Sequence, residues 1–227
     1  MGRIIDFLLW CLKWPAAVYL LFSLPALFSS YDYFEFNAMH FYMFALGAGF
    51  YLFTIVAVGY NNCHSLQVIS HELTHVLFAY LTLHNAGIVR INPDGDGGSM
   101  RFWGRGNWLI ALAPYFFPLL SFLYMLLMPY LLAATGNNWI IYAIFGYFFA
   151  YYVITVLEQV HPRQTDIIRE GYVFSSIIII GANLYITGMI LAFNSKQWDG
   201  VGIYLGLVNR LNGENLQKAA EFLANYI

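Results

Sequence analysis

The chain has 227 residues, of which 60% are hydrophobic, 19% aromatic and only 10% charged. Soluble domains contain about 45–50% apolar residues, so this composition predicts an integral, multi-pass membrane protein. The formal net charge of −2, without a local cluster of lysine or arginine, excludes a nucleic-acid-binding surface and a polybasic lipid anchor.

The N-terminal stretch MGRIIDFLLWCLKW is interpreted as a retained membrane anchor. Asp6 stands where an N-myristoylation pattern needs serine or threonine, and Lys13 interrupts what would be the apolar core of a signal peptide. A membrane span near 14–29 follows. Residues 4–29 could instead form an interfacial helix that leads into a span broken at Pro15 or Pro25.

Long apolar segments recur along the rest of the chain. A helix needs about 20 apolar residues to cross the hydrocarbon core of a bilayer. On this criterion the chain has about six transmembrane segments, near 14–29, 38–60, 64–84, 107–134, 139–160 and 172–195. Within the second segment, the small residues Ala45 and Gly49 predict close packing against another helix. The expected fold class is an all-α polytopic membrane protein.

The loop between the third and fourth segments, HNAGIVRINPDGDGGSMRFWGRG, predicts a short β-hairpin, because two β-prone stretches flank a turn-forming centre. Its centre is similar to the start of an EF-hand, with the series Asn92, Asp94, Asp96 and Gly97. The twelfth position of that loop is Trp103, where calcium binding requires a bidentate glutamate. A Gly/Asp turn is therefore favoured over a calcium site.

The tail from Lys196 contains a predicted break at Asn212–Gly213 and then apolar residues on one helical face, namely Leu216, Ala219, Ala220, Leu223 and Tyr226. We expect this tail to lie on the membrane surface or against the helical bundle.

The third segment contains the motif HELTH, in which His71 and His75 are four residues apart and Glu72 lies between them. On an α-helix these histidines differ by about 40°, so both imidazoles project from one face and can bind one ion. In an HExxH arrangement the glutamate is not a ligand. It accepts a proton from a metal-bound water that attacks a carbonyl. Zinc (Zn²⁺) is favoured because imidazole binds it well and hydrolysis needs no redox change.

Three polar groups within five residues of a membrane span need a physical reason. Each ionisable group costs about 2.5–3.5 kcal/mol at the middle of a span on insertion scales. A metal ion would offset this cost. The alternatives are a polar cluster that mediates helix packing, or a site that no longer binds metal.

A catalytic zinc ion takes three protein ligands and leaves one position for water, so a further ligand is needed. Two aspartates compete for this role. Asp94 lies in NPDG, and Asp166 lies in VLEQVHPRQTDIIREG, just after the fifth segment. Pro162 can unwind the end of that segment and let the Asp166 carboxylate turn inward.

HELTH in a membrane segment, followed by GIVRINPDGDGG and later by a proline-containing polar break with an aspartate, resembles the site-2 protease family over roughly residues 61–172. The resemblance implies an intramembrane zinc metalloprotease whose third ligand is an aspartate in a later, locally unwound helix. The family motif NPDG, taken literally, would pick Asp94. Asp94 comes only 19 residues after His75 (94 − 75), within the predicted hairpin, so the aspartate in the later helix is Asp166. Asp166 departs from the family pattern because Ile167 follows it instead of glycine, and HPRQTD lacks the usual Asn-Leu-Leu-Pro approach.

The sequence leaves several roles open for the polar residues around Asp166. Thr165 or Asp166 could be the N-cap of an exposed helix. His161 is a substitute third ligand. Among the nearby polar residues Glu158 and Gln159, Glu158 lies near where the family often places an asparagine, so it could stabilise an oxyanion or orient a ligand, or extend to the membrane interface.

The predicted function is that of a membrane-embedded zinc metalloendopeptidase, with Glu72 as the base and His71, His75 and Asp166 as the metal ligands. Its partners would be a membrane-protein substrate and the lipid bilayer, without nucleic acid. The alternative is a non-proteolytic membrane protein whose zinc site is structural or inactive and which binds a client or lipid. The predicted parts are N-terminal membrane helices (1–60), a metalloprotease core (61–172), a C-terminal transmembrane helix (173–195) and an amphipathic tail (196–227).

Overall fold

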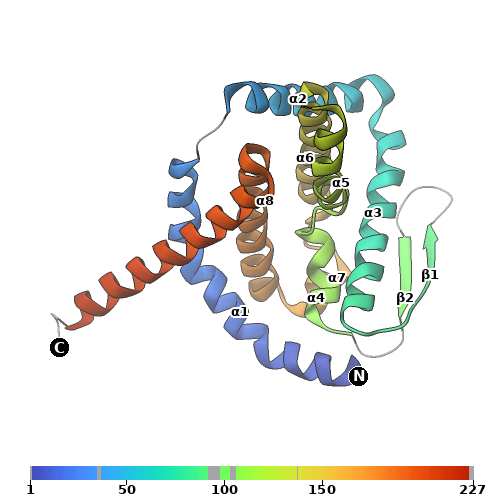
Figure 1. Cartoon of the computed structure of the whole chain (residues 1–227). Helices are drawn as coiled ribbons and strands as arrows, with labels where there is room; N and C mark the ends of the chain where they lie inside the picture. Colours follow the sequence, from blue (N-terminus) through green and yellow to red (C-terminus); the bar gives the residue numbers. More distant parts are fainter. Residues whose placement is uncertain (1, 35–36, 92–97, 103–105, 137, 225–227) are drawn as a thin grey trace.

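The computed structural model describes residues 2–34, 37–91, 98–102, 106–136 and 138–224, and the molecule is mostly helical (Figure 1). In chain order the elements are α1 (Gly2–Ser30), the 3-10 helix η1 (Tyr31–Tyr33), α2 (Ala38–Val58), α3 (Tyr60–Leu81), β1 (Ala86–Ile91), β2 (Gly98–Phe102), α4 (Trp108–Leu112), the 3-10 helix η2 (Ala113–Tyr115), α5 (Leu119–Thr135), α6 (Trp139–Gln159), α7 (Thr165–Glu170) and α8 (Tyr172–Ala224).

Within the described residues, four helices are long and apolar enough to cross a membrane. They are α1 with its extension η1, then α2, α6 and α8, and a bent pair made of α4–η2 and α5 brings the number to five. The sequence predicts about six segments, and the difference is α3, whose polar residues lower its hydropathy. Pro15 and Pro25 both lie inside α1, which runs from Gly2 to Ser30 as one helix.

The segment predicted at 107–134 is apolar enough for one span, but it is not one continuous helix. The chain forms the short helices α4 and η2, leaves helical structure, and resumes as α5 at an angle of 77°. Pro114 and Pro118 account for the break, because proline lacks a backbone N–H and clashes with the preceding turn. The bend places Tyr115, at the end of η2, in the buried interior.

The tail begins at a sharp change of direction inside α8. Lys196 and Gln197 have non-helical backbone angles, with φ of 52° at Gln197. Beyond this break the helix packs against α1 and the first half of α8, through a cluster that includes Leu27, Tyr204 and Val208. The predicted break at Asn212–Gly213 is wrong, because the helix continues to Ala224. Its last turns project from the bundle (Figure 1).

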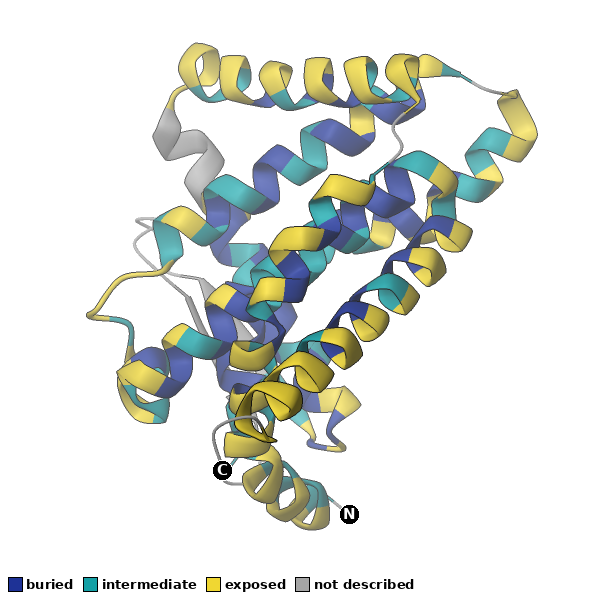
Figure 2. Ribbon diagram, turned by 90° about the vertical axis from the view of Figure 1, so that its left-hand side faces the viewer, coloured by how far each residue is buried: buried dark blue, intermediate teal, exposed yellow. Residues whose placement is uncertain are grey.

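The most extensive helix contact joins α2 and α6. Gly47 lies against the backbone of Ala143, and Gly146 lies against the backbone of Phe44, so that a Cβ atom at either glycine would overlap a carbonyl group. The close packing predicted for Ala45 and Gly49 is wrong, because both are exposed on the other face of α2. This outer face lies along the top of Figure 2, where it is coloured as exposed.

Strands β1 and β2 pair antiparallel, with Val89 opposite Met100 and Ile91 opposite Gly98. Both strands contact α3 and lie beside it on the side away from the other helices (Figure 1). The predicted turn between them, including Asp94 and the EF-hand-like series, lies outside the described residues, as does Trp103.

Candidate metal centre

Helix α3 presents His71 and His75 on one face, one turn apart. Their Nε2 atoms lie 3.1 Å from each other, and the rings meet edge to face. His75 and Glu72 are 8% and 7% exposed, so the polar face of α3 is turned into the protein. The helical repeat alone explains this pair, because residues four apart project in nearly the same direction.

Asp166 reaches the same place from a segment much later in the chain. Helix α6 ends at Gln159, residues 160–164 form a turn that includes Pro162, and Asp166 lies in the first turn of α7. Its Oδ2 atom lies 3.5 Å from His75 Nε2. The alternative in which Thr165 or Asp166 caps an exposed helix is wrong, because Gln164 is the N-cap residue of α7.

Among the described residues, His71, His75 and Asp166 form a group whose potential ligand atoms all lie within 4.8 Å of one another. A tetrahedral zinc ion with ligand bonds of about 2.0–2.2 Å separates its ligand atoms by about 3.3–3.6 Å. The two separations that involve His75 Nε2, 3.1 and 3.5 Å, are close to this range. All the ligand atoms lie within 4.8 Å of one another, so the group is compact enough for a zinc ion held by two imidazoles and a carboxylate.

Glu72 is not part of this group of ligand atoms, although it interacts electrostatically with His75 and Asp166. This placement suits a base beside a metal ion more than a ligand. His161, the substitute ligand considered from the sequence, is exposed, and its Nδ1 accepts a hydrogen bond from the backbone N–H of Arg163.

Each of the three candidate ligands has a hydrogen-bond partner outside the group. His71 Nδ1 donates to Gln159 Oε1 at 2.7 Å, and His75 Nδ1 donates to the carbonyl oxygen of Ile110 at 2.8 Å. These bonds place a proton on each Nδ1, so Nε2 is the ring atom that faces the shared site and would bind a metal ion. The Tyr115 hydroxyl donates to Asp166 Oδ2 at 3.3 Å.

Burial alone would raise the pKa of Asp166. The hydrogen bond and charge of His75, assisted by His71 and Tyr115, outweigh burial and hold this pKa below its ordinary value. Asp166 is therefore ionised at neutral pH, which is the form that binds a metal ion.

Sequence reasoning noted Gln159 only as a nearby polar residue and did not identify Tyr115. The signal for Tyr115 was present in the string APYFFP, where two prolines interrupt an apolar segment and turn the backbone inward. Glu158 lies beside Gln159 but outside the group of ligand atoms, so the described contacts assign the orienting role to Gln159.

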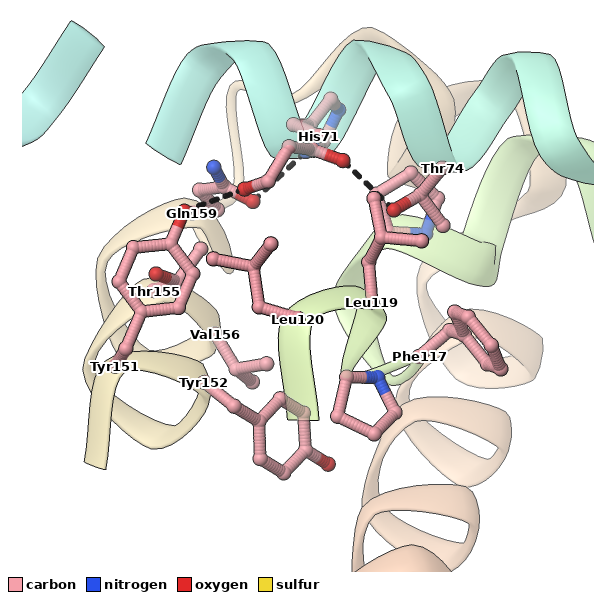
Figure 3. Close-up of a pocket in the computed structure, with 13 residues that line it drawn as sticks. His71, Thr74, Phe117, Leu119, Leu120, Tyr151, Tyr152, Thr155, Val156 and Gln159 are labelled. Atoms are coloured by element: carbon pink, nitrogen blue, oxygen red, sulfur yellow. Dashed lines mark hydrogen bonds between the residues drawn. The ribbon is translucent and has the colours of Figure 1, made fainter. Parts of the chain in front are cut away.

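A pocket opens beside His71, between α3, the start of α5 and α6 (Figure 3). His71, Thr74 and Gln159 contribute polar groups to it. Apolar and aromatic side chains form most of the remaining wall, among them Phe117, Leu119, Leu120, Tyr151, Tyr152 and Val156. The wall beside the candidate metal centre is therefore mostly apolar.

Comparison with known protein families gives a match to the peptidase M50B-like family over residues 42–208. This range is wider than the resemblance seen in the sequence at 61–172. It also includes most of α2 and α8 as far as residue 208. No curated protein and no solved structure matches the chain. The match spans most of the chain, including His71, Glu72, His75 and Asp166. The chain therefore belongs to the peptidase M50B-like family of site-2 proteases and is an integral, multi-pass membrane protein.

Proposed function

We propose that the chain is an intramembrane zinc metalloprotease that hydrolyses peptide bonds in or near transmembrane segments of other proteins. The observation that carries the proposal is the convergence of His71, His75 and Asp166, whose ligand atoms lie within 4.8 Å of one another. Membership of a peptidase family supports the reaction class.

The roles of the residues follow from their positions. His71, His75 and Asp166 would hold the zinc ion, which when bound supplies Lewis-acid activation of water and of a peptide carbonyl. Glu72, beside the ligands, accepts a proton from the attacking water and passes it to the leaving amine. Gln159 and the carbonyl of Ile110 keep the two imidazoles oriented, and Tyr115 holds the Asp166 carboxylate.

We place α3 inside the bilayer, within the bundle, although its polar residues lower its hydropathy. His75 and Glu72 are shielded by neighbouring elements and have polar partners close by, which lowers the cost of taking them into a membrane. With α3 added to the four spans and the bent pair, the proposed number of membrane segments is six.

The substrate would bind as an extended segment, because a backbone amide held in an α-helix is poorly placed for attack. In the two-stranded pair each strand has one edge without a strand partner among the described residues. We propose that an unwound substrate segment adds to the β1 edge near residues 87–90, next to the helix that carries Glu72.

The substitution Glu72→Gln tests the proposed reaction, because it removes the base and keeps the shape of the side chain. We expect cleavage of a membrane-protein substrate to fall by about 10²–10⁴-fold, with the bound zinc retained. The exposed His161→Ala is a matched control with parental cleavage. Undiminished cleavage by Glu72→Gln would remove Glu72 from this role, and zinc binding without cleavage by the parent would favour the non-proteolytic alternative.

A further inference from the structure

Helix α1 lies outside the residues that match the family, yet it contacts the elements that carry or orient the candidate metal ligands. Most of its surface is exposed. Asp6, one turn from its start, is an exception. Asp6 Oδ1 accepts a hydrogen bond from Asn107 Nδ2 at 2.9 Å, and Asp6 Oδ2 accepts one from His84 Nε2 at 3.1 Å.

The first of these bonds is linked to His75 through a short series of contacts. Asn107 caps α4 by accepting a hydrogen bond from the backbone N–H of Ile110 at 3.1 Å. The carbonyl oxygen of the same Ile110 accepts the bond from His75 Nδ1. Asp6 therefore orients the cap of the short helix whose backbone holds a metal ligand.

The second bond of Asp6 is linked to the end of α3. His84 Nδ1 lies 3.1 Å from Thr82 Oγ1, and Thr82 Oγ1 donates to the carbonyl oxygen of Phe78 at 2.7 Å. The Phe78 carbonyl also accepts the backbone N–H of Thr82, so the hydroxyl adds a second hydrogen bond to the last turn of the helix that bears His71 and His75. Asp6 thus contacts two segments of the chain, one that precedes β1 and one that follows β2.

Lys13, two turns further along α1, makes a similar contact with α7. Its ammonium nitrogen lies 2.8 Å from Glu170 Oε2 and 3.1 Å from the Glu170 carbonyl oxygen, and it lies over the ring of Phe174. Glu170 is the last residue of α7 and comes one turn after Asp166. A six-residue helix is too short to be stable alone, so its orientation depends on such contacts.

We infer that α1 is a positioning element of the metal centre, in which Asp6 fixes α4 and the end of α3, and Lys13 fixes α7, so that the three ligands keep their spacing. The inference rests on the proposed zinc site. Neither residue touches the ligand atoms, so both act through the backbone segments that bear or orient the ligands. A merely structural role would instead stabilise the fold and leave the affinity for zinc unchanged.

The chain offers a matched control on the same helix. Ser23 accepts a buried hydrogen bond from Asn212 Nδ2 at 2.9 Å, which joins α1 to the second half of α8, away from α4 and α7. The substitution Ser23→Ala therefore removes a polar contact of α1 that has no connection with the metal ligands.

The test compares the full-length parent with Asp6→Ala, Lys13→Met and Ser23→Ala in detergent. Zinc dissociation constants are measured by competition with a chelator, and the unfolding temperatures of the metal-free proteins are measured in parallel. We expect Asp6→Ala and Lys13→Met each to bind zinc about 10–100-fold more weakly, as found when partners of metal ligands are removed. Ser23→Ala should lower only the unfolding temperature. Lys13→Met removes the charge and keeps an unbranched apolar side chain, so it carries the test if Asp6→Ala does not fold.

A charge exchange adds a readout that general destabilisation cannot mimic. Lys13→Glu should weaken zinc binding, and the combination of Lys13→Glu with Glu170→Lys should restore part of it, because the ion pair is rebuilt in reverse. Parental zinc affinity in Asp6→Ala and Lys13→Met, or an equal loss of zinc affinity in Ser23→Ala, would overturn the inference about α1 and leave the proposed function standing. A parent protein that binds no zinc would overturn the proposed function as well.

Discussion

Helices α3 and α7 supply the candidate metal ligands in two different ways. In α3 the helical repeat itself brings His71 and His75 together, and the helix is 22 residues long. In α7 a single carboxylate lies in a helix of six residues, between the end of α6 and Gly171, whose φ is 92°. The geometry of α3 is thus local, whereas that of α7 depends on residues from α1, η2 and α8.

This difference separates the parts of a metal site that a motif specifies from those that the tertiary structure specifies. Ile167, the neighbour of Asp166, is buried in a cluster with Tyr115 and Phe174, and Lys13 holds the end of the same helix. Substitutions around α7 should therefore change metal binding through the position of Asp166, while those within α3 should act on the ligands directly.

The largest expected effect is that of His75→Ala, which removes a ligand from α3. We expect zinc affinity to fall by more than about 100-fold, since the two remaining ligands cannot complete a catalytic site. The measurement is zinc retained by the purified protein after dialysis. His161→Ala, at an exposed histidine, is the control and should retain parental zinc. Equal zinc in His75→Ala and the parent would show that His75 is not a zinc ligand.

An intermediate loss of zinc affinity is expected when a hydrogen bond that orients a ligand is removed, either at Asp166 on α7 or at His71 on α3. Tyr115→Phe keeps the ring against His71 and deletes the donor to Asp166, whereas Gln159→Met deletes the acceptor of His71 Nδ1. Both should weaken zinc binding by about 10–100-fold. We expect the greater loss in Tyr115→Phe, because α7 has less local structure to hold its ligand. Chelator competition would measure both, and a greater loss in Gln159→Met would reverse the comparison.

The smallest effect on zinc affinity is expected at the contact between α2 and α6, because neither helix carries a candidate ligand. Gly47→Ala places a methyl group against the backbone of Ala143, and overpacking of this kind costs about 1–3 kcal/mol of unfolding free energy. Gly49→Ala, on the same helix, meets open space and is the control. Thermal unfolding should separate the two variants while their zinc affinities stay alike. A lower unfolding temperature in Gly49→Ala than in Gly47→Ala would contradict the described packing.

The sequence was informative where the physical signal was local. Apolar composition predicted a multi-pass membrane protein, and a single turn of helix predicted that His71 and His75 would face one direction. Asp166 was a candidate because of the Pro162 break, and the family resemblance favoured it over Asp94. Asp166 and His75 are 91 positions apart in the chain (166 − 75), so no local pattern predicts that they converge.

Other features depended on contacts that no periodicity reveals. The segment 107–134 is apolar enough to predict one helix, and its prolines determine the bend that brings Tyr115 to Asp166. Gly47 and Gly49 lie two residues apart on α2, but only the neighbouring helix distinguishes them. The contacts of Asp6 and Lys13 join residues 101 and 157 positions apart in the chain, so they emerge only in the folded structure.

The most direct test of the proposed centre is the zinc content of the purified parent, His71→Ala, Asp166→Ala and Asp94→Ala, measured by elemental analysis under one set of conditions. We predict about one zinc ion per parent chain, loss of zinc in His71→Ala and Asp166→Ala, and parental zinc in Asp94→Ala. Loss of zinc in Asp94→Ala with full retention in Asp166→Ala would contradict the pairing of α3 with α7.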